Sequence, residues 1–242
     1  MTGDFIYVDV PHRAPTTPEV YVMQYRQVYA SPSIQPILPN IPFYHVGDDH
    51  DIINDYDQGP NTSLYKNASW AFNAYHRAPN PSPVHSDVNY FIMDYADTSF
   101  FFMDTRSYRS SNFAEDGPNK TMLGERQLRD LVEWANKCER DKVVWKFIIS
   151  SVPITNNWKG PDGTRDTWGG FMHERGIVLE ALKDVSNVVV ISGVLFLPVS
   201  LFAAFVPSVL CVVRCMWLMY RIVMRRLSLY FRVTFWRFPC HL

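Results

Sequence analysis

Between Gly47 and Asp57 the chain places five aspartates, one asparagine and one histidine within eleven residues. Carboxylate oxygens and an imidazole nitrogen are common protein ligands of metal ions. The apolar run 41–46 stands directly before this segment and predicts a strand that ends at Gly47. Polar residues at the end of a strand gather at a sheet edge, where binding sites form. The sequence therefore predicts a metal site here, with a solvated acidic loop as the plain alternative.

A second polar segment, near the start of the chain, could lie close to the acidic segment 47–57. Asp4 and Tyr7 belong to a short stretch in which residues 5–8 predict a strand or the end of one. Adjacent strands lie about 4.8 Å apart, so residues at their ends can converge. Asp4, Tyr7, Asp49 and His50 would then suit two metal ions about 3.5–4 Å apart, as in phosphoryl transfer. His50, just outside the metal ligands, could protonate a leaving alkoxide.

Arg106 and Arg109 follow another predicted strand, 99–104. An arginine donates two parallel hydrogen bonds to a phosphate group, so both residues could bind a substrate. Pairing with nearby acidic side chains is an equally reasonable role for them. Both roles therefore stay open for these two arginines.

Strands and helices alternate along the rest of the chain. Apolar residues at helical spacing predict helices over 63–76, 123–135 and 170–183, and an aromatic stretch over 21–29 is a further helix candidate. Strands are expected at 90–95 and 99–104, joined by the turn 96–98, and at 143–150 and 187–192. This alternation predicts a layered α/β fold in which helices cover a mixed sheet.

The chain has 242 residues and a net charge of −1, which argues against a nucleic-acid-binding protein with a basic face. The charge is uneven, because residues 194–242 hold six arginines and no acidic residue. Three of the four cysteines also lie there, so residues 1–193 have no disulfide framework. No secretory signal is visible at Met1, and the length suits one α/β domain over 1–193 with a tail over 194–242.

The chain also carries an ordered set of motifs. They are Gly3-Asp4-Phe5-Ile6-Tyr7-Val8-Asp9, Asp48-Asp49-His50-Asp51 with Asn54-Asp55, Asp104-Thr105-Arg106-Ser107-Tyr108-Arg109, Ser150-Ser151-Val152-Pro153, Asp166-Thr167-Trp168-Gly169-Gly170-Phe171 and Val188-Val189-Val190-Ile191-Ser192-Gly193. From residue 3 to residue 193 this set closely resembles the alkaline phosphatase D (PhoD-like) family of the calcineurin-like metallophosphatase superfamily. The resemblance implies a metallophosphatase-type αββα sandwich, incomplete at both ends in this chain. After it we expect an apolar helical tail.

The resemblance further implies a hydrolase of phosphate mono- or diesters that uses two metal ions, iron and calcium. By motif position, Asp4, Tyr7 and Asp49 would be metal ligands, and Asp4 would bridge the two ions. His50 would be the catalytic histidine over the leaving group. We add Arg106 as a candidate catalytic residue and Arg109 as a candidate substrate-binding residue.

The chain departs from the family pattern at two places. The family has a further ligand on a strand before Gly3 and an Asp-x-His sequence after Gly193, whereas this chain has Met1-Thr2 and Val194-Leu195-Phe196 there. Catalysis by two metal ions needs every ligand in place. We therefore expect weak or no hydrolysis by this polypeptide.

The tail can be interpreted in three ways. The uncharged run 194–213 is long enough to cross a bilayer, with Arg214 and later arginines on the cytoplasmic side. A helix lying on a membrane surface is disfavoured, because the run is uniformly apolar. The abrupt loss of the family pattern at Val194 favours the third interpretation, sequence translated from an intron or a shifted frame. The rival hypotheses to a phosphoesterase are a non-catalytic, membrane-anchored remnant and a plain calcium site.

Overall fold

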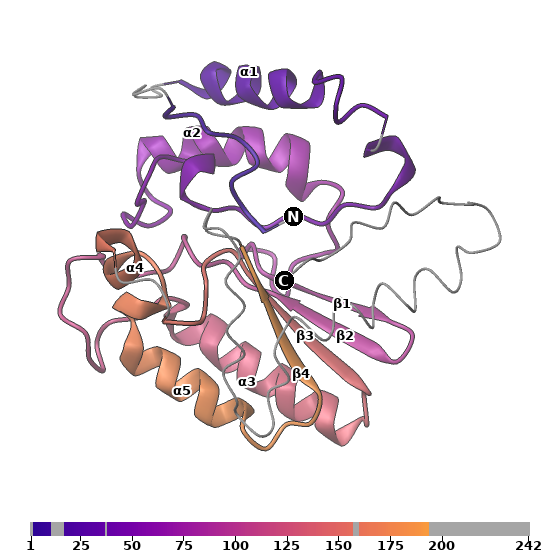
Figure 1. Ribbon diagram of the computed structural model, residues 1–242, viewed down its shortest axis with the longest axis vertical. Helices are drawn as coiled ribbons and strands as arrows, with labels where there is room; N and C mark the ends of the chain where they lie inside the picture. The colour runs from indigo at the N-terminus through magenta and orange to yellow at the C-terminus, as the bar shows by residue number, and fades with distance from the viewer. Residues whose placement is uncertain (1, 11–16, 37, 157–159, 194–242) are drawn as a thin grey trace, which may run out of the picture.

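Four strands build one mixed sheet in the computed structural model, which describes residues 2–10, 17–36, 38–156 and 160–193. The strands are β1 (Phe91–Tyr95), β2 (Thr98–Phe102), β3 (Trp145–Ser150) and β4 (Val188–Ser192), in the order β1-β2-β3-β4 (Figure 1). β1 and β2 are antiparallel around a tight turn in which Ala96 has a φ of +53°. β3 and β4 run parallel to β2, so the carboxyl ends of these three strands point the same way.

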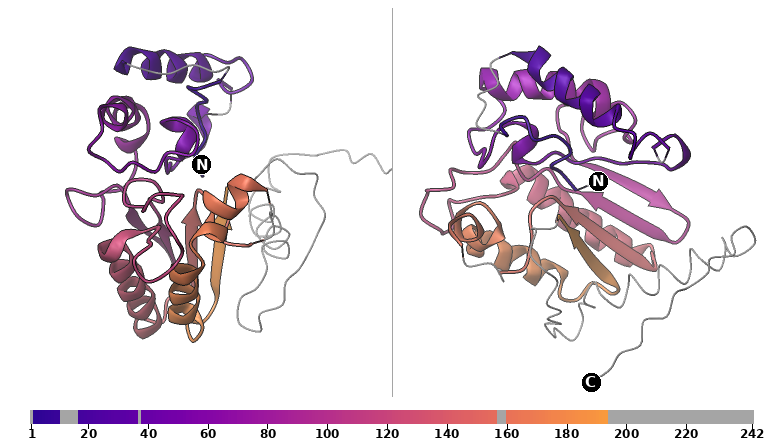
Figure 2. Two further views of the ribbon diagram at one scale, coloured as in Figure 1. Left: turned by 90° about the vertical axis from the view of Figure 1, so that its left-hand side faces the viewer. Right: turned by 45° about the horizontal axis from the view of Figure 1, so that its top comes forward.

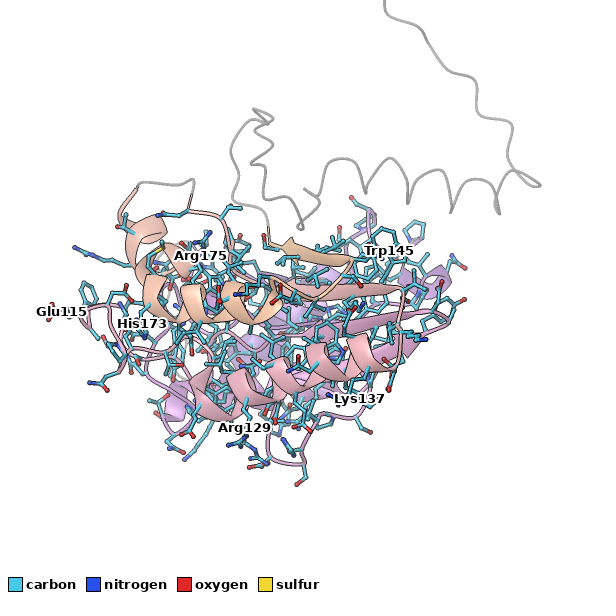
Figure 3. The ribbon with its side chains drawn as sticks, turned by 90° about the horizontal axis from the view of Figure 1, so that it is seen from below. Glu115, Arg129, Lys137, Trp145, His173 and Arg175 are labelled. Atoms are coloured by element: carbon cyan, nitrogen blue, oxygen red, sulfur yellow. The ribbon has the colours of Figure 1, made fainter. Side chains whose placement is uncertain are left out.

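Two helices cover one face of the sheet. They are α3 (Gly124–Arg140) and α5 (Met172–Leu182), and Figure 2 shows them beside each other on the sheet. On α3, Leu131, Trp134 and Cys138 recur at helical spacing and are buried in the same core as Phe101 and Ile148. The labelled side chains Arg129 and Lys137 of α3 point away from the sheet (Figure 3). The amphipathic pattern of α3 therefore decides which of its sides is buried.

A second group of helices lies beyond the carboxyl ends of the parallel strands (Figures 1 and 2). It consists of α1 (Pro18–Tyr29) and α2 (Ser63–Phe72), with α2 continuing into a π-helical turn, η3 (Asn73–Arg77). Shorter elements are η1 (Leu38–Asn40), η2 (Asp49–Asp51), α4 (Pro161–Arg165) and η4 (Trp168–Gly170). The core between α1 and α2 also buries Phe5, Ile6 and Val8. The amino-terminal segment is thereby fixed at the end of the sheet.

The predicted helices and strands of residues 63–192 are confirmed, with shifts of a few residues at their ends. The aromatic stretch 21–29 is also helical, as the main part of α1. The strands predicted over 5–8 and 41–46 are wrong. Neither segment forms a strand, and the ladder contact near them is one isolated parallel bridge between Thr2 and Val46. The positive φ angles of Gly3 (+86°) and Asp4 (+52°) turn the chain there, so an extended strand cannot continue.

The αββα sandwich is matched only in part, because the described residues form a single sheet. The face opposite α3 and α5 carries its own apolar cluster, which includes Phe102, Phe147 and Val189 with Val46 packed among them. The expected helical tail, and within it the candidate span 194–213, lie outside the described residues. Among the helices that the structure does describe, none is both long and apolar enough to cross a membrane.

A pair of histidines is buried among the aromatic residues around α1 and α2. The rings of His45 and His76 stack with centroids 3.6 Å apart, and Phe5 packs edge-on against both. His45 Nδ1 and His76 Nε2 are buried without a hydrogen-bond partner. Burial lowers the pKa of His45 to about 4. Burial and the neighbouring His45 lower the pKa of His76 to about 2.

These two histidines predict an acid-sensitive fold. Both folded pKa values lie below the ordinary value of 6.5, so the unfolded chain binds more protons as the pH falls from 6.5 towards 4. Their contribution to stability is complete above pH 6.5 and is lost as the pH falls through that window, on the order of 3 kcal/mol from each histidine and about 6 kcal/mol together by pH 4. The loss of stability is measured by urea unfolding of the wild-type protein and of the double variant His45→Phe/His76→Phe between pH 6.5 and pH 4. Equal slopes of unfolding free energy against pH in both proteins would contradict the prediction.

Candidate active site

The buried carboxylate of Asp51 ties the acidic loop to the start of the chain. Its oxygens accept backbone N–H groups from Asp4 at 3.1 Å, Ile6 at 3.2 Å and Asp48 at 3.0 Å. Asp48 and Asp51 also cap the short helix η2 reciprocally, so the loop holds its own shape. Two segments more than 40 residues apart in the sequence are therefore fixed side by side.

Close approach of these segments requires the glycine at position 3. Gly3 has a φ of +86°, in the region that favours glycine. A Cβ atom there would also lie 2.4 Å from the Cβ of Asp48, which is far too close. Asp4 follows with a φ of +52°, an uncommon conformation for a residue with a side chain. This backbone directs the Asp4 carboxylate towards the acidic loop.

Asp4, Asp49 and His50 form the centre of the site. One possible ligand atom from each lies within 4.8 Å of the other two, a grouping that could hold a metal ion. Tyr7 joins them, because its hydroxyl donates to Asp4 Oδ2 at 3.1 Å and its ring lies 4.3 Å from the His50 ring. Asp4 Oδ1 is buried and has no hydrogen-bond partner. An unpaired buried carboxylate oxygen is costly, and a bound cation would satisfy it.

The electrostatics of this cluster also favour a cation. Burial, followed by the neighbouring Asp49, raises the pKa of the Asp4 carboxyl. Burial and the adjacent Asp4 raise the pKa of the Tyr7 phenol. Both shifts arise because negative charge is crowded where solvent is partly excluded. A metal ion among these groups would reverse the effect and favour their deprotonated forms.

His50 is oriented by Asp9. Its Nδ1 lies 2.8 Å and 3.1 Å from the two oxygens of Asp9, so the ring donates Nδ1–H to that carboxylate. Asp9 in turn accepts the backbone N–H of Asn54 at 2.7 Å. Burial alone would lower the pKa of His50, but the hydrogen bond to Asp9 and the nearby Asp49 raise it above the ordinary value. The other ring nitrogen, Nε2, is left for a further contact.

Arg106 lies beneath the cluster and is almost fully buried. Its guanidinium donates to Asp48 at 2.5 Å and to both oxygens of Asp166 at 2.5 Å and 2.6 Å. A longer ion pair of 3.3 Å reaches Asp49. Burial opposes ionisation of Asp166, but Arg106 and Arg109 hold its pKa well below the usual range. Of the two roles that the sequence left open for Arg106, the structure therefore shows pairing with acidic side chains.

The side chain of Arg109 is fully buried. It donates to Asp166 Oδ1 at 2.7 Å, to the Thr105 carbonyl at 2.7 Å and to Asn112 Oδ1 at 3.0 Å. Phe171 packs against the same guanidinium, 5.3 Å from its centre. All the polar groups near Arg109 are thus provided by the protein.

A pocket of about 450 Å³ opens over these residues at the carboxyl edge of the sheet. Asp4, Tyr7, Asp49, His50 and Arg106 line it, whereas Arg109 does not. Ser151 after β3 and Gly193 after β4 form part of its wall. The structure therefore brings together five of the six residues predicted from the sequence.

Three important residues were not predicted from the sequence as site residues. Asp9, Asp51 and Asp166 each stand inside a motif quoted above, but motif position alone assigned them no role. Asp9 follows Asp4 by five residues, and a search for a carboxylate partner of His50 would have considered it. Asp51 and Asp166 make contacts that no local spacing reveals.

The fold and the pocket define an α/β domain whose polar site lies at the carboxyl edge of its parallel strands. The sequence profile of PhoD-like phosphatases matches residues 2–195, and the chain belongs to that family. A solved structure of PhoD superposes on this one with a TM-score of 0.63 at 22% identity. The match covers 79% of this chain and 44% of the PhoD chain, so this chain spans less than half of that protein. A search of curated proteins found no match.

Replacement of Asp51 tests the link between the two segments. Asp51→Ala leaves three backbone N–H groups without an acceptor, and we expect a loss of about 2–4 kcal/mol in the free energy of unfolding. Urea denaturation measures it. The exposed aspartate of the Lys137 ion pair supplies the control, since Asp141→Ala should cost about 0.5 kcal/mol or less. Equal losses in the two variants would show that Asp51 does not hold the site together.

Proposed function

We propose that this chain is a metal-dependent phosphoesterase that hydrolyses phosphate mono- or diesters. The observation that carries the proposal is the cluster of Asp4, Asp49 and His50, with a buried, unpartnered oxygen on Asp4. It lines the pocket of a chain that belongs to the PhoD-like phosphatase family. Carboxylates and an imidazole in a pocket are the groups that metal-assisted hydrolysis requires.

Asp4, Asp49 and the Tyr7 phenol are the proposed metal ligands, and their oxygens suit iron or calcium. A bound metal ion supplies a Lewis acid and lowers the pKa of a coordinated water. A second group of possible ligands combines Asp49 with Asp55 and Asp166. Asp166 already pairs with Arg106 and a second arginine, so that group suits a cation poorly. The described residues thus support one of the two ions expected from the family resemblance.

His50 is the proposed proton donor to the leaving group. Because Asp9 accepts the Nδ1–H of His50, the ring is held in one orientation with Nε2 free for the substrate. A proton on Nε2 can then pass to the alkoxide oxygen as the ester bond breaks. The raised pKa of His50 favours the protonated ring that this step needs.

Arg106 and Arg109 have a supporting role in this proposal. Their guanidinium groups hold Asp48 and Asp166, and the side chain of Arg109 has no surface in the pocket. Neither is assigned to the phosphate group, although Arg106 remains close enough to Asp49 to influence that ligand. The expected turnover is low, since Val194 stands where the family pattern continues with an aspartate.

Metal binding tests the proposal directly. The protein titrated with Fe²⁺ without oxygen, and separately with Ca²⁺, is expected to bind one ion per chain in the described site. Asp49→Ala removes a ligand and should weaken that binding by about 100-fold or more. Asp141→Ala removes an exposed carboxylate on α3 and should leave it unchanged. A wild-type protein that binds neither ion would refute the proposed function.

The role of His50 is tested by hydrolysis of bis(p-nitrophenyl) phosphate with both ions supplied. His50→Ala should lower kcat by about 10²–10⁴-fold, the usual contribution of a general acid. Asp9→Asn, which disturbs the ring orientation, should give a smaller loss. His85 provides a matched control, because it does not line the pocket and its Nε2 pairs with Asp130 Oδ2 at a distance of 2.8 Å. His85→Ala should keep wild-type turnover. Unchanged turnover in His50→Ala would rule out His50 as the proton donor.

A further inference from the structure

Asp166 lines the pocket and accepts several hydrogen bonds from side chains. Its Oδ1 accepts from Arg106 Nη1, from Arg109 Nη1 at 2.7 Å and from Asn112 Nδ2 at 2.9 Å. Its Oδ2 accepts from Arg106 Nη2 at 2.6 Å. Both oxygens are therefore occupied by protein donors. A carboxylate in this position is better suited to hold other side chains than to bind a ligand.

The Arg106 guanidinium lies between Asp166 and the proposed metal ligand Asp49. Nη2 is 2.6 Å from Asp166 Oδ2 but 3.3 Å from Asp49 Oδ1. The first contact is a short, charge-assisted hydrogen bond, and the second is an ion pair outside hydrogen-bond geometry. The same nitrogen could serve either carboxylate. Its present position is set by the two-point pairing with Asp166, together with the contact of Arg106 Nε to Asp48 at 2.5 Å on the other edge of the guanidinium.

Asp49 has one oxygen already in use on its other side. Its Oδ2 accepts the backbone N–H of Asp55 at 2.7 Å. If Arg106 moved towards Asp49, Oδ1 would become a hydrogen-bond acceptor as well. Both oxygens would then be engaged by protein donors, and a metal ion would have to displace a buried guanidinium.

We propose that Asp166 is a positioning residue of the metal site. Asp166 holds the Arg106 guanidinium away from Asp49 and so keeps Asp49 Oδ1 available to a metal ion. This inference rests on the proposed function, because it takes Asp49 to be a metal ligand. Asp166 acts here through Arg106 and does not touch the metal ion. Residues that orient metal ligands from outside commonly change metal affinity by about 10–100-fold when they are replaced.

The test is metal affinity in Asp166→Asn, measured with whichever of Fe²⁺ and Ca²⁺ the wild-type protein binds. The asparagine keeps the shape of the side chain but loses the charge that holds Arg106. We expect binding to weaken by about 10–100-fold. Glu174→Gln is the matched control, because Glu174 is an equally buried carboxylate that caps the start of α3 through Met122 and Leu123, without contact to the metal ligands. Its metal affinity should equal that of the wild-type protein.

A double variant separates this role from a general structural one. If Asp166 acts by restraining Arg106, then removal of the guanidinium in Arg106→Gln/Asp166→Asn should restore affinity to within a few-fold of wild type. A double variant that binds as weakly as Asp166→Asn, or more weakly, would overturn the proposal. So would wild-type affinity in Asp166→Asn alone.

Folding of each variant is checked by thermal unfolding without metal. If Asp166→Asn fails to fold, the metal affinity of the single variant Arg106→Gln tests the inference instead. In that variant Asp166 keeps its pairs with Arg109 and Asn112. Removal of the competing cation should leave affinity equal to or higher than that of the wild-type protein, and a clear loss would overturn the inference. A wild-type protein that binds no metal would defeat the proposed function itself, whereas equal binding by wild type and Asp166→Asn would defeat only this inference.

Discussion

The carboxylate of Asp51 is the interaction on which the candidate site depends. It accepts backbone N–H groups from Asp4, Ile6 and Asp48, and it is buried, so no solvent could replace it. Neither the first residues of the chain nor the acidic loop is part of the four-stranded sheet. Their relative position therefore comes mainly from buried side-chain contacts such as this one and from the core around Ile6, with one isolated bridge of the strand type between Thr2 and Val46.

Charge is distributed around the site in two layers. In the inner layer Arg106 and Arg109 compensate Asp166, and Arg106 also compensates Asp48. In the outer layer, at the pocket, Asp4 has a buried oxygen without a partner and a raised pKa. Each acid of the inner layer has an arginine partner, which offsets the cost of burying its charge. The outer layer is the part of the structure that a cation would complete.

The main body of the fold could be predicted from the sequence because its elements have local patterns. Leu131, Trp134 and Cys138 lie on one side of α3, and the continuous apolar run of β4 suits a buried parallel strand. The prediction failed over 5–8 and 41–46, which are apolar but not strands. Over 5–8, the left-handed backbone at Gly3 and Asp4 directly before the segment prevails over the apolar pattern. The order of residue types along the sequence does not by itself reveal such backbone φ angles.

By itself the sequence determined which chemical groups are present and in what order: acids and a phenol near residue 4, acids and a histidine near residue 50, and arginines near residue 106. Only the tertiary structure decided their partners. Asp9 meets His50 across 41 positions, and Asp166 meets Arg106 across 60. Contacts of this kind depend on how whole elements pack, and they leave no periodic trace along the chain. For that reason the arginines, two candidate phosphate binders by residue type, became in the folded protein the cations of a buried ion-pair network.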